Sequence, residues 1–135
     1  MRTPVVLCVL ALVLSACGAT PRDSAKDFSG AKRGVASTVE DLEAAARKDD
    51  PGRLCTTLLT DGLLTALKKQ GTNCVTATKQ AFKDADSLDL TVDEVTISGN
   101  TATAKVTSGT GSKEKTDTLE LERDGTTWKV SALRA

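Results

Sequence analysis

The spacing of hydrophobic residues changes once along the chain, and this change limits the possible folds more than any other feature. Val35, Val39, Leu42 and Ala46 recur at helical spacing, which places one apolar face on a helix. From residue 88 onward, apolar and polar residues alternate, which is typical of half-buried strands. The order predicts an α+β domain, with N-terminal helices packed on a curved antiparallel sheet of about four strands in a cone-like arrangement.

Local signals divide the first half into short helices. Asp50 can cap a helix that has proline at its first position. Thr60 or Asp61 can begin the next helix, and Gly71 is a favourable stop after it. A last helical segment is expected over residues 74–82.

Turn signals divide the second half into strands. The turns are expected at residues 98–100, 109–112 and 124–125. A break in the alternation at Asp93-Glu94 predicts a β-bulge. The last strand, residues 126–133, should place Trp128 and Val130 on one face of the sheet and Leu133 on the other.

The first 17 residues have the pattern of an export signal. Arg2 supplies a positive charge, and an apolar run of ten residues follows from Val5 to Leu14. That run is too short for a membrane-spanning helix of about 20 residues and fits the core of a secretory signal. The segment Leu14-Ser15-Ala16-Cys17 resembles the lipobox of bacterial lipoproteins, in which two small residues precede an acylated cysteine.

The lipobox resemblance implies a lipid-anchored protein on the extracytoplasmic face of the cell membrane. Residues 1–16 would be the cleaved signal peptide, and Cys17 would carry acyl chains such as palmitate. Residues 17–34, small and polar, would form the lipidated cysteine and a flexible tether. The folded domain would then occupy residues 35–135. The alternative is an ordinary secreted protein in which Cys17 is incidental.

The four cysteines divide into separate roles. Cys8 leaves with the signal and Cys17 is acylated, so Cys55 and Cys74 remain in a compartment that permits disulfides. We therefore expect one structural disulfide between them. Free thiols are the second interpretation and a metal site the last, because a metal would need two carboxylates to complete its ligands. We expect no metal and no cofactor.

Composition excludes several kinds of partner. The chain has 18 basic and 18 acidic residues, so no net charge favours nucleic acid. It has one tryptophan, two phenylalanines and no tyrosine, too few aromatic residues for a stacked sugar site or a large binding surface. It has no histidine, so the usual activation of a serine or threonine hydroxyl is absent.

The inward positions of the expected strands could line a pocket beneath the helices. These positions are Ala102, Ala104, Val106, Leu119, Leu121 and Trp128. Small side chains there could leave room for an apolar ligand. The alternative is that helices pack directly onto them and fill the core.

A group of residues over positions 35–133 resembles a known family. The segments Leu54-Cys55-x-x-Leu58-Leu59 and Asp124-Gly125-x-x-Trp128-x-Val130, together with Cys74, are similar to small lipoproteins of Gram-positive bacteria with a nuclear-transport-factor-2-like (NTF2-like) domain. Ketosteroid isomerases and polyketide cyclases share that fold. The resemblance implies a concave, partly apolar pocket. The catalytic branches use a cavity-facing Asp, His or Tyr, and no catalytic residue can be transferred to this chain by position.

Three classes of function follow. A non-catalytic interaction or accessory domain, bound to an unknown envelope protein, ranks first because it needs no special residues. A carrier or sensor of a small apolar ligand is the alternative, and an enclosed apolar cavity on the order of a few hundred Å³ would favour it. A filled core with one exposed apolar patch would favour the interaction domain. Catalysis ranks last, and a buried carboxylate without a cationic partner would revive it.

Overall fold

The computed structural model describes residues 23–85 and 87–134, so the export signal and Cys17 lie outside the described residues. The helices of this part are α1 (Gly30–Arg47), α2 (Pro51–Arg53), α3 (Asp61–Lys69) and α4 (Cys74–Asp84). The strands are β1 (Leu90–Ser98), β2 (Thr101–Ser108), β3 (Lys115–Asp124) and β4 (Thr127–Arg134). Short helical turns complete the chain at η1 (Ala25–Asp27), η2 (Leu54–Leu58) and η3 (Gly111–Lys113).

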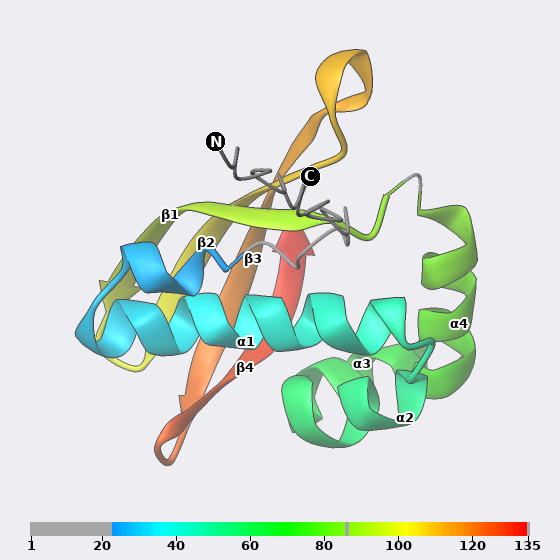
Figure 1. Ribbon diagram of the computed structural model, residues 1–135. Helices are drawn as coiled ribbons and strands as arrows, with labels where there is room; N and C mark the ends of the chain where they lie inside the picture. Colours follow the sequence, from blue (N-terminus) through cyan, green and yellow to red (C-terminus); the bar gives the residue numbers. More distant parts are fainter. Residues whose placement is uncertain (1–22, 86, 135) are drawn as a thin grey trace, which may run out of the picture.

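The four strands form one antiparallel sheet in the order β1-β2-β3-β4, so each strand pairs with its neighbour in the sequence. The helices lie on one side of this open sheet, and α1 runs across it (Figure 1). The predicted α+β fold, with helices before an antiparallel sheet of four strands, is confirmed.

Helix α1 supplies the main contact with the sheet. Its Val35 and Val39 are fully buried in the same cluster as Ala104 and Leu121 of the inner sheet face. The Thr38 hydroxyl lies 3.2 Å from the backbone carbonyl oxygen of Trp128, to which it can donate a hydrogen bond. The apolar residues at helical spacing therefore form the buried face of α1, as expected.

The folded domain begins earlier than the sequence predicts. Residues 17–34 were expected to be a tether, yet α1 starts at Gly30, and Ser24 and Ala25 are buried. The Ser24 hydroxyl oxygen accepts a hydrogen bond from the Val92 backbone N–H at 3.2 Å, and Glu40 accepts one from the Ala25 N–H at 2.8 Å. Composition could not reveal this, because the segment is mostly polar, and its hydrogen bonds and the packing of Ala25 and Phe28 on the core depend on partners far away in the sequence.

The predicted helix ends are confirmed at three positions. The Asp50 side chain accepts a hydrogen bond from the Arg53 N–H, and the Thr60 side chain accepts one from the Leu63 N–H. Gly71 follows α3 with φ +79°, a conformation that favours glycine. Asp50 and Thr60 thus fix where α2 and α3 begin, and Gly71 marks where α3 ends.

Two bulges interrupt the sheet. The predicted one is confirmed, because the pairing of β1 with β2 shifts between Val92 and Glu94. A second was not predicted: Leu121 pairs with Val130, whereas Glu120 pairs with Ala132. This shift leaves one residue of β4 without a partner on β3 and reverses the faces of the residues that follow.

Candidate functional site

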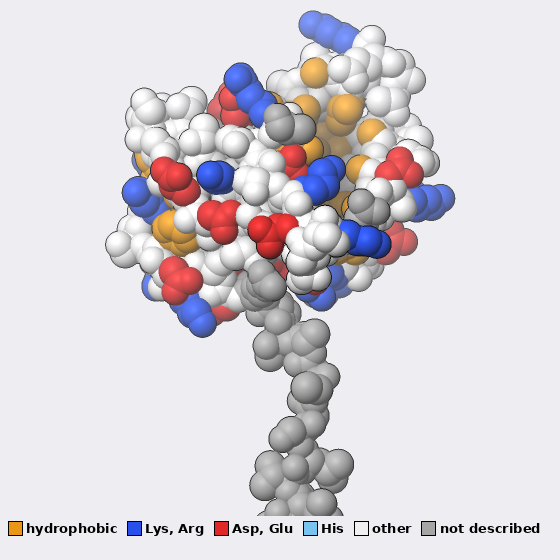
Figure 2. Space-filling view, turned by 90° about the horizontal axis from the view of Figure 1, so that it is seen from above, with side chains coloured by type: hydrophobic (Ala, Val, Ile, Leu, Met, Phe, Trp, Pro, Cys, Tyr) orange, Lys and Arg blue, Asp and Glu red, His pale blue; other side chains and the backbone are white. Residues whose placement is uncertain are grey.

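A cavity of about 520 Å³ lies between the inner sheet face and helices α3 and α4. In Figure 2 a hollow with hydrophobic side chains is visible on the upper right of the molecule. The apolar lining comes from both halves of the chain: Leu42, Leu54, Leu59, Leu63, Leu67, Ala77, Ala81, Phe82, Ala85, Leu90, Val106, Leu119, Val130 and Leu133.

The cavity exists because α3 and α4 stand beside the sheet instead of packing tightly on it (Figure 1). In α3 no described residue is fully buried, and in α4 only Thr78 is. Leu63 and Leu67 of α3 and Phe82 of α4 are half-buried and face the cavity. Helix–sheet interfaces normally close to high packing density, so these walls leave apolar surface available to a further molecule.

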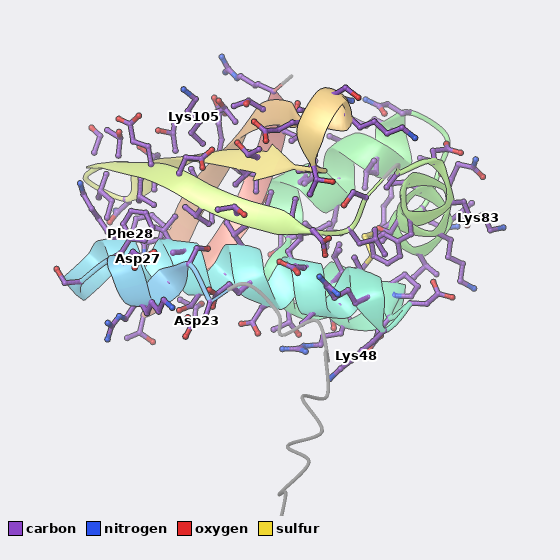
Figure 3. All side chains as sticks on the ribbon, turned by 45° about the horizontal axis from the view of Figure 1, so that its top comes forward. Asp23, Asp27, Phe28, Lys48, Lys83 and Lys105 are labelled. Atoms are coloured by element: carbon purple, nitrogen blue, oxygen red, sulfur yellow. A yellow bond between two sulfur atoms is a disulfide. The ribbon has the colours of Figure 1, made fainter. Side chains whose placement is uncertain are left out.

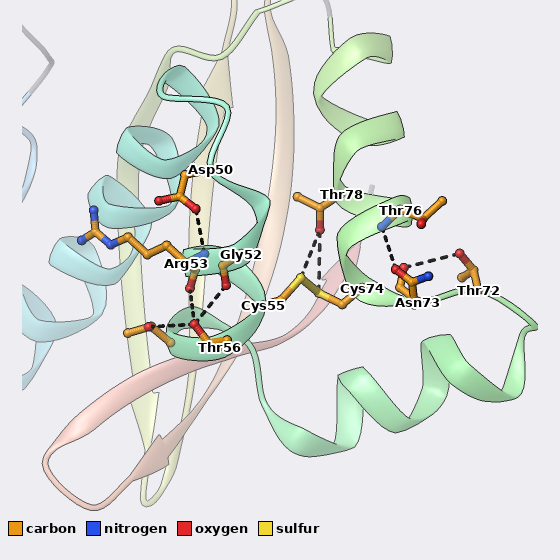
Figure 4. The surroundings of a disulfide bond; sticks show 11 residues. Asp50, Gly52, Arg53, Cys55, Thr56, Thr72, Asn73, Cys74, Thr76 and Thr78 are labelled. Carbon is orange, nitrogen blue, oxygen red and sulfur yellow. Dashed lines mark hydrogen bonds between the residues drawn. A yellow bond between two sulfur atoms is a disulfide. The ribbon is translucent and has the colours of Figure 1, made fainter.

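The disulfide attaches the outer wall to the core. Cys55 of η2 and Cys74 at the start of α4 form the expected bond, with their Cα atoms 5.9 Å apart (Figure 4). The Thr78 hydroxyl lies 3.8 Å from each sulfur, and Thr78 also lines the cavity. The disulfide thus fixes the α4 wall at the cavity itself.

Charged and polar residues collect at one end of the cavity. They are Asp84, Ser87, Ser108, Lys113, Lys115 and Asp117. Asp84 accepts hydrogen bonds from Gln80. The side chains of Lys113, Lys115 and Asp117 form no ion pair or hydrogen bond within the described part of the chain. The cavity therefore has an apolar interior and a charged mouth with both signs.

The predicted pocket residues divide between cavity and core. Val106 and Leu119 line the cavity. Ala102, Ala104, Leu121 and Trp128 are buried and do not line it. The prediction was wrong for these four because α1 packs directly on that part of the sheet. A Cβ atom at Gly34 of α1 would lie 3.3 Å from the indole of Trp128, which shows how closely helix and strand approach.

Leu133 is a cavity residue that the sequence alternation missed. The expected face was opposite to Val130, but the bulge in β4 moves Leu133 to the inner side, where it pairs with Leu119. Its side chain is 66% exposed and lines the cavity together with Val130. A one-residue shift reverses the face of every later residue in a strand, and no turn residue marks this one.

Two smaller hollows have simpler explanations. One, on the outer side of α1, holds Asp23, Glu40, Asp41, Glu43 and Arg47. Glu43 is buried, and it accepts hydrogen bonds from Arg47 and from the Leu90 backbone N–H. The bond to Glu43 raises the pKa of Arg47, which also pairs with Asp89. These carboxylates serve the fold, and no cluster that could hold a metal occurs among the described residues.

The other hollow is bordered by threonines of η2 and of the β3–β4 turn, beside Trp128. Trp128 is 6% exposed there and is covered by Arg123, whose guanidinium lies 4.8 Å from the ring centre. Little of the indole is left for a ligand. Among the residues described, no helix is both long and apolar enough to span a bilayer.

Solved structures of low sequence identity share this architecture. A de novo designed NTF2 fold protein matches with a TM-score of 0.54 and 12% identity, over 80% of this chain and 87% of its own. The solution structure of a SEC-C motif containing protein from Rhodopseudomonas palustris matches with a TM-score of 0.55 and 14% identity, over 73% and 76%. No protein family and no curated protein matches the sequence. The described part of the chain thus has an NTF2-like fold, with an apolar cavity open at one side.

Proposed function

We propose that this protein is a lipoprotein of the type found in Gram-positive bacteria, anchored through Cys17 outside the cell membrane, and that its NTF2-like domain binds a small apolar ligand. The export signal and the lipobox support the anchor. The cavity is open on one side rather than enclosed, but its volume and apolar lining support a ligand. On that basis we rank the carrier or sensor function ahead of the interaction domain that ranked first from sequence.

The cavity is the observation that carries this proposal. Its volume of about 520 Å³ lies within the range of small-molecule sites. Its lining leaves Leu133 66% exposed, although a large apolar side chain is stabilised by removal from water. A ligand that fills the space would cover Leu133 and the half-buried leucines of α3 without any rearrangement of the core.

Binding without catalysis fits the polar groups of the cavity. Asp117 is a half-buried carboxylate without a cationic partner in the described residues, which meets part of the condition set for an enzyme. A reaction also needs a second group placed to donate or accept a proton. The chain has no histidine or tyrosine to fill that role, and Lys113 and Lys115 lie exposed at the mouth.

Photolabelling tests the site. The lipid-anchored protein, reconstituted in vesicles, would be irradiated with the small apolar probe trifluoromethylphenyl diazirine and its peptides analysed by mass spectrometry. We expect label in the peptides of α3 and α4 that line the cavity. Ala81→Trp should reduce that label at least five-fold, because Ala81 faces the cavity with an exposed side chain that indole can extend from.

Ala66→Trp is the matched control, since Ala66 is an exposed residue of α3 that does not line the cavity. Equal labelling of both variants and the native protein would contradict a ligand in this cavity. If labelling of the cavity instead depends on capture of an envelope protein on the same surface, the result would support the interaction domain.

A further inference from the structure

Asp117 is the innermost charged side chain on the β3 wall of the cavity. Residues at alternate positions of a strand share one face, and along this face Leu119 is buried, Asp117 is half-buried and Lys115 is exposed. All three residues line the cavity. Asp117 therefore lies between the apolar part of the wall and the lysine at the mouth.

Two neighbours of Asp117 on this face are apolar and buried. Across the strands Asp117 pairs with Val106 of β2, which also lines the cavity. Toward the buried end of β3, the next residue on the face is Leu119, which pairs with Leu133 of β4. A ligand whose apolar part covers Val106 and Leu119 would therefore also remove water from the Asp117 carboxylate.

No protein group replaces that water. The other carboxylate of the cavity, Asp84, is exposed and already accepts hydrogen bonds from Gln80. Within residues 23–85 and 87–134, the Asp117 side chain forms neither a hydrogen bond nor an ion pair. A carboxylate that loses water without gaining a donor is costly, so the ligand must bring the donor. An ammonium group forms the stronger, charge-assisted bond.

The order of charges along β3 argues against an apolar acid. If the carboxylate of such a ligand paired with Lys115, its apolar chain would pass over Asp117, which would lose water and gain no donor. Lys113 and Lys115 are exposed and keep their own water, so neither requires an anion from the ligand.

The lysines at the mouth do not prevent a cation from binding. Along a strand, residues two positions apart are separated by about 6.7 Å, so Lys115 repels a ligand cation at Asp117 from that distance and through water. Direct contact with the Asp117 carboxylate acts over a shorter distance and in a partly dry site, where the Coulomb energy is larger.

We propose that the cavity binds an amphipathic amine, a ligand in which one ammonium group is joined directly to an apolar body. The apolar body lies against Val106, Leu119 and Leu133, and the ammonium group donates a hydrogen bond to the Asp117 carboxylate. This inference rests on the proposed function and specifies the class of ligand for the same site.

Three photoprobes that share an apolar ring and differ in the polar group test the ligand class. They are the benzylamine, the benzyl alcohol and the benzoic acid that carry the trifluoromethyl diazirine opposite the polar group. Each would be added at equal free concentration to phosphatidylcholine vesicles that hold the lipid-anchored protein. We expect the amine, a cation at neutral pH, to label the α3 and α4 cavity peptides at least five-fold more than the alcohol or the acid.

Variants of the charged residues test the role of Asp117. Asp117→Asn should reduce labelling by the amine at least five-fold but leave labelling by the alcohol within two-fold, because the apolar walls stay in place. The matched control is Glu122→Gln, at an exposed position of β3 outside the cavity. Lys115→Gln removes a neighbouring positive charge and should keep or raise labelling by the amine. Its control is Lys105→Gln, on the side of the sheet away from α1 (Figure 3).

The outcomes separate this inference from the proposed function. Equal labelling by the amine and the alcohol, stronger labelling by the acid, or full labelling of Asp117→Asn by the amine would overturn the inference while the proposed function stands. A five-fold loss of amine labelling in Lys115→Gln would overturn it as well. If neither these probes nor trifluoromethylphenyl diazirine labels the cavity, both the inference and the proposed function are overturned.

Discussion

At the scale of single residues, Glu43 is a buried polar side chain that joins α1 to the start of β1. It is 3% exposed, and its two carboxylate oxygens accept hydrogen bonds from Arg47 and from the Leu90 backbone N–H at the start of β1. We expect Glu43→Ala to lower the free energy of unfolding by about 2 kcal/mol, because it leaves a shielded N–H without an acceptor. Chemical denaturation measures this change. Glu122→Gln, at an exposed position, should stay within about 0.5 kcal/mol of the native protein, and an equal effect of both changes would contradict the assigned role.

The sequence predicts individual residues well where a local signal decides their position. Asp50 and Thr60 cap helices as expected, because a cap depends on atoms three residues away. Which residues line the pocket depends on which helix lies over which part of the sheet. The spacing of hydrophobic residues in the sequence does not contain that information. Ala102 and Trp128 therefore belong to the core under α1, while Leu133 and Asp117 line the cavity without having been singled out.

At the scale of elements, the disulfide determines how firmly α4 is held. Only Thr78 of this helix is buried, so apolar packing contributes little to its position. Replacing both Cys55 and Cys74 by alanine should lower the free energy of unfolding by about 3 kcal/mol, on the entropy of a loop of this length. The loss should also appear locally, as faster amide hydrogen exchange in α4 than in the sheet. Unchanged exchange in α4 would show that the helix is held by other contacts.

The helices and strands themselves follow from the sequence almost completely. The change of hydrophobic spacing near residue 88 separates the helices from the strands, and the glycine-containing turns separate the strands of the antiparallel meander. Two features escaped: the segment with η1, whose contacts combine hydrogen bonds with the burial of Ala25, and the bulge in β4, which has no glycine or proline to mark it. Both depend on partners far away in the sequence.

At the scale of the whole molecule, we propose that Cys17 anchors the protein to the membrane. We expect Cys17→Ala to abolish incorporation of radiolabelled palmitate. The variant should either be released into the medium or remain as an uncleaved precursor. Cys8→Ala, within the apolar run of the export signal, is the matched control and should keep both label and location. Palmitate retained by Cys17→Ala would refute the assignment of the anchor to Cys17.

The hydrogen bond between Ser24 and Val92 affects how the edge of the sheet behaves when copies of the protein meet. β1 forms one border of the sheet, and main-chain groups along such a border can recruit a strand from another molecule. Ser24 occupies the amide of Val92, and the neighbouring bulge disrupts the regular spacing of the row. If the proposed anchor concentrates copies in two dimensions, they would meet often, and the contact between Ser24 and Val92 makes such encounters less able to grow into shared sheets.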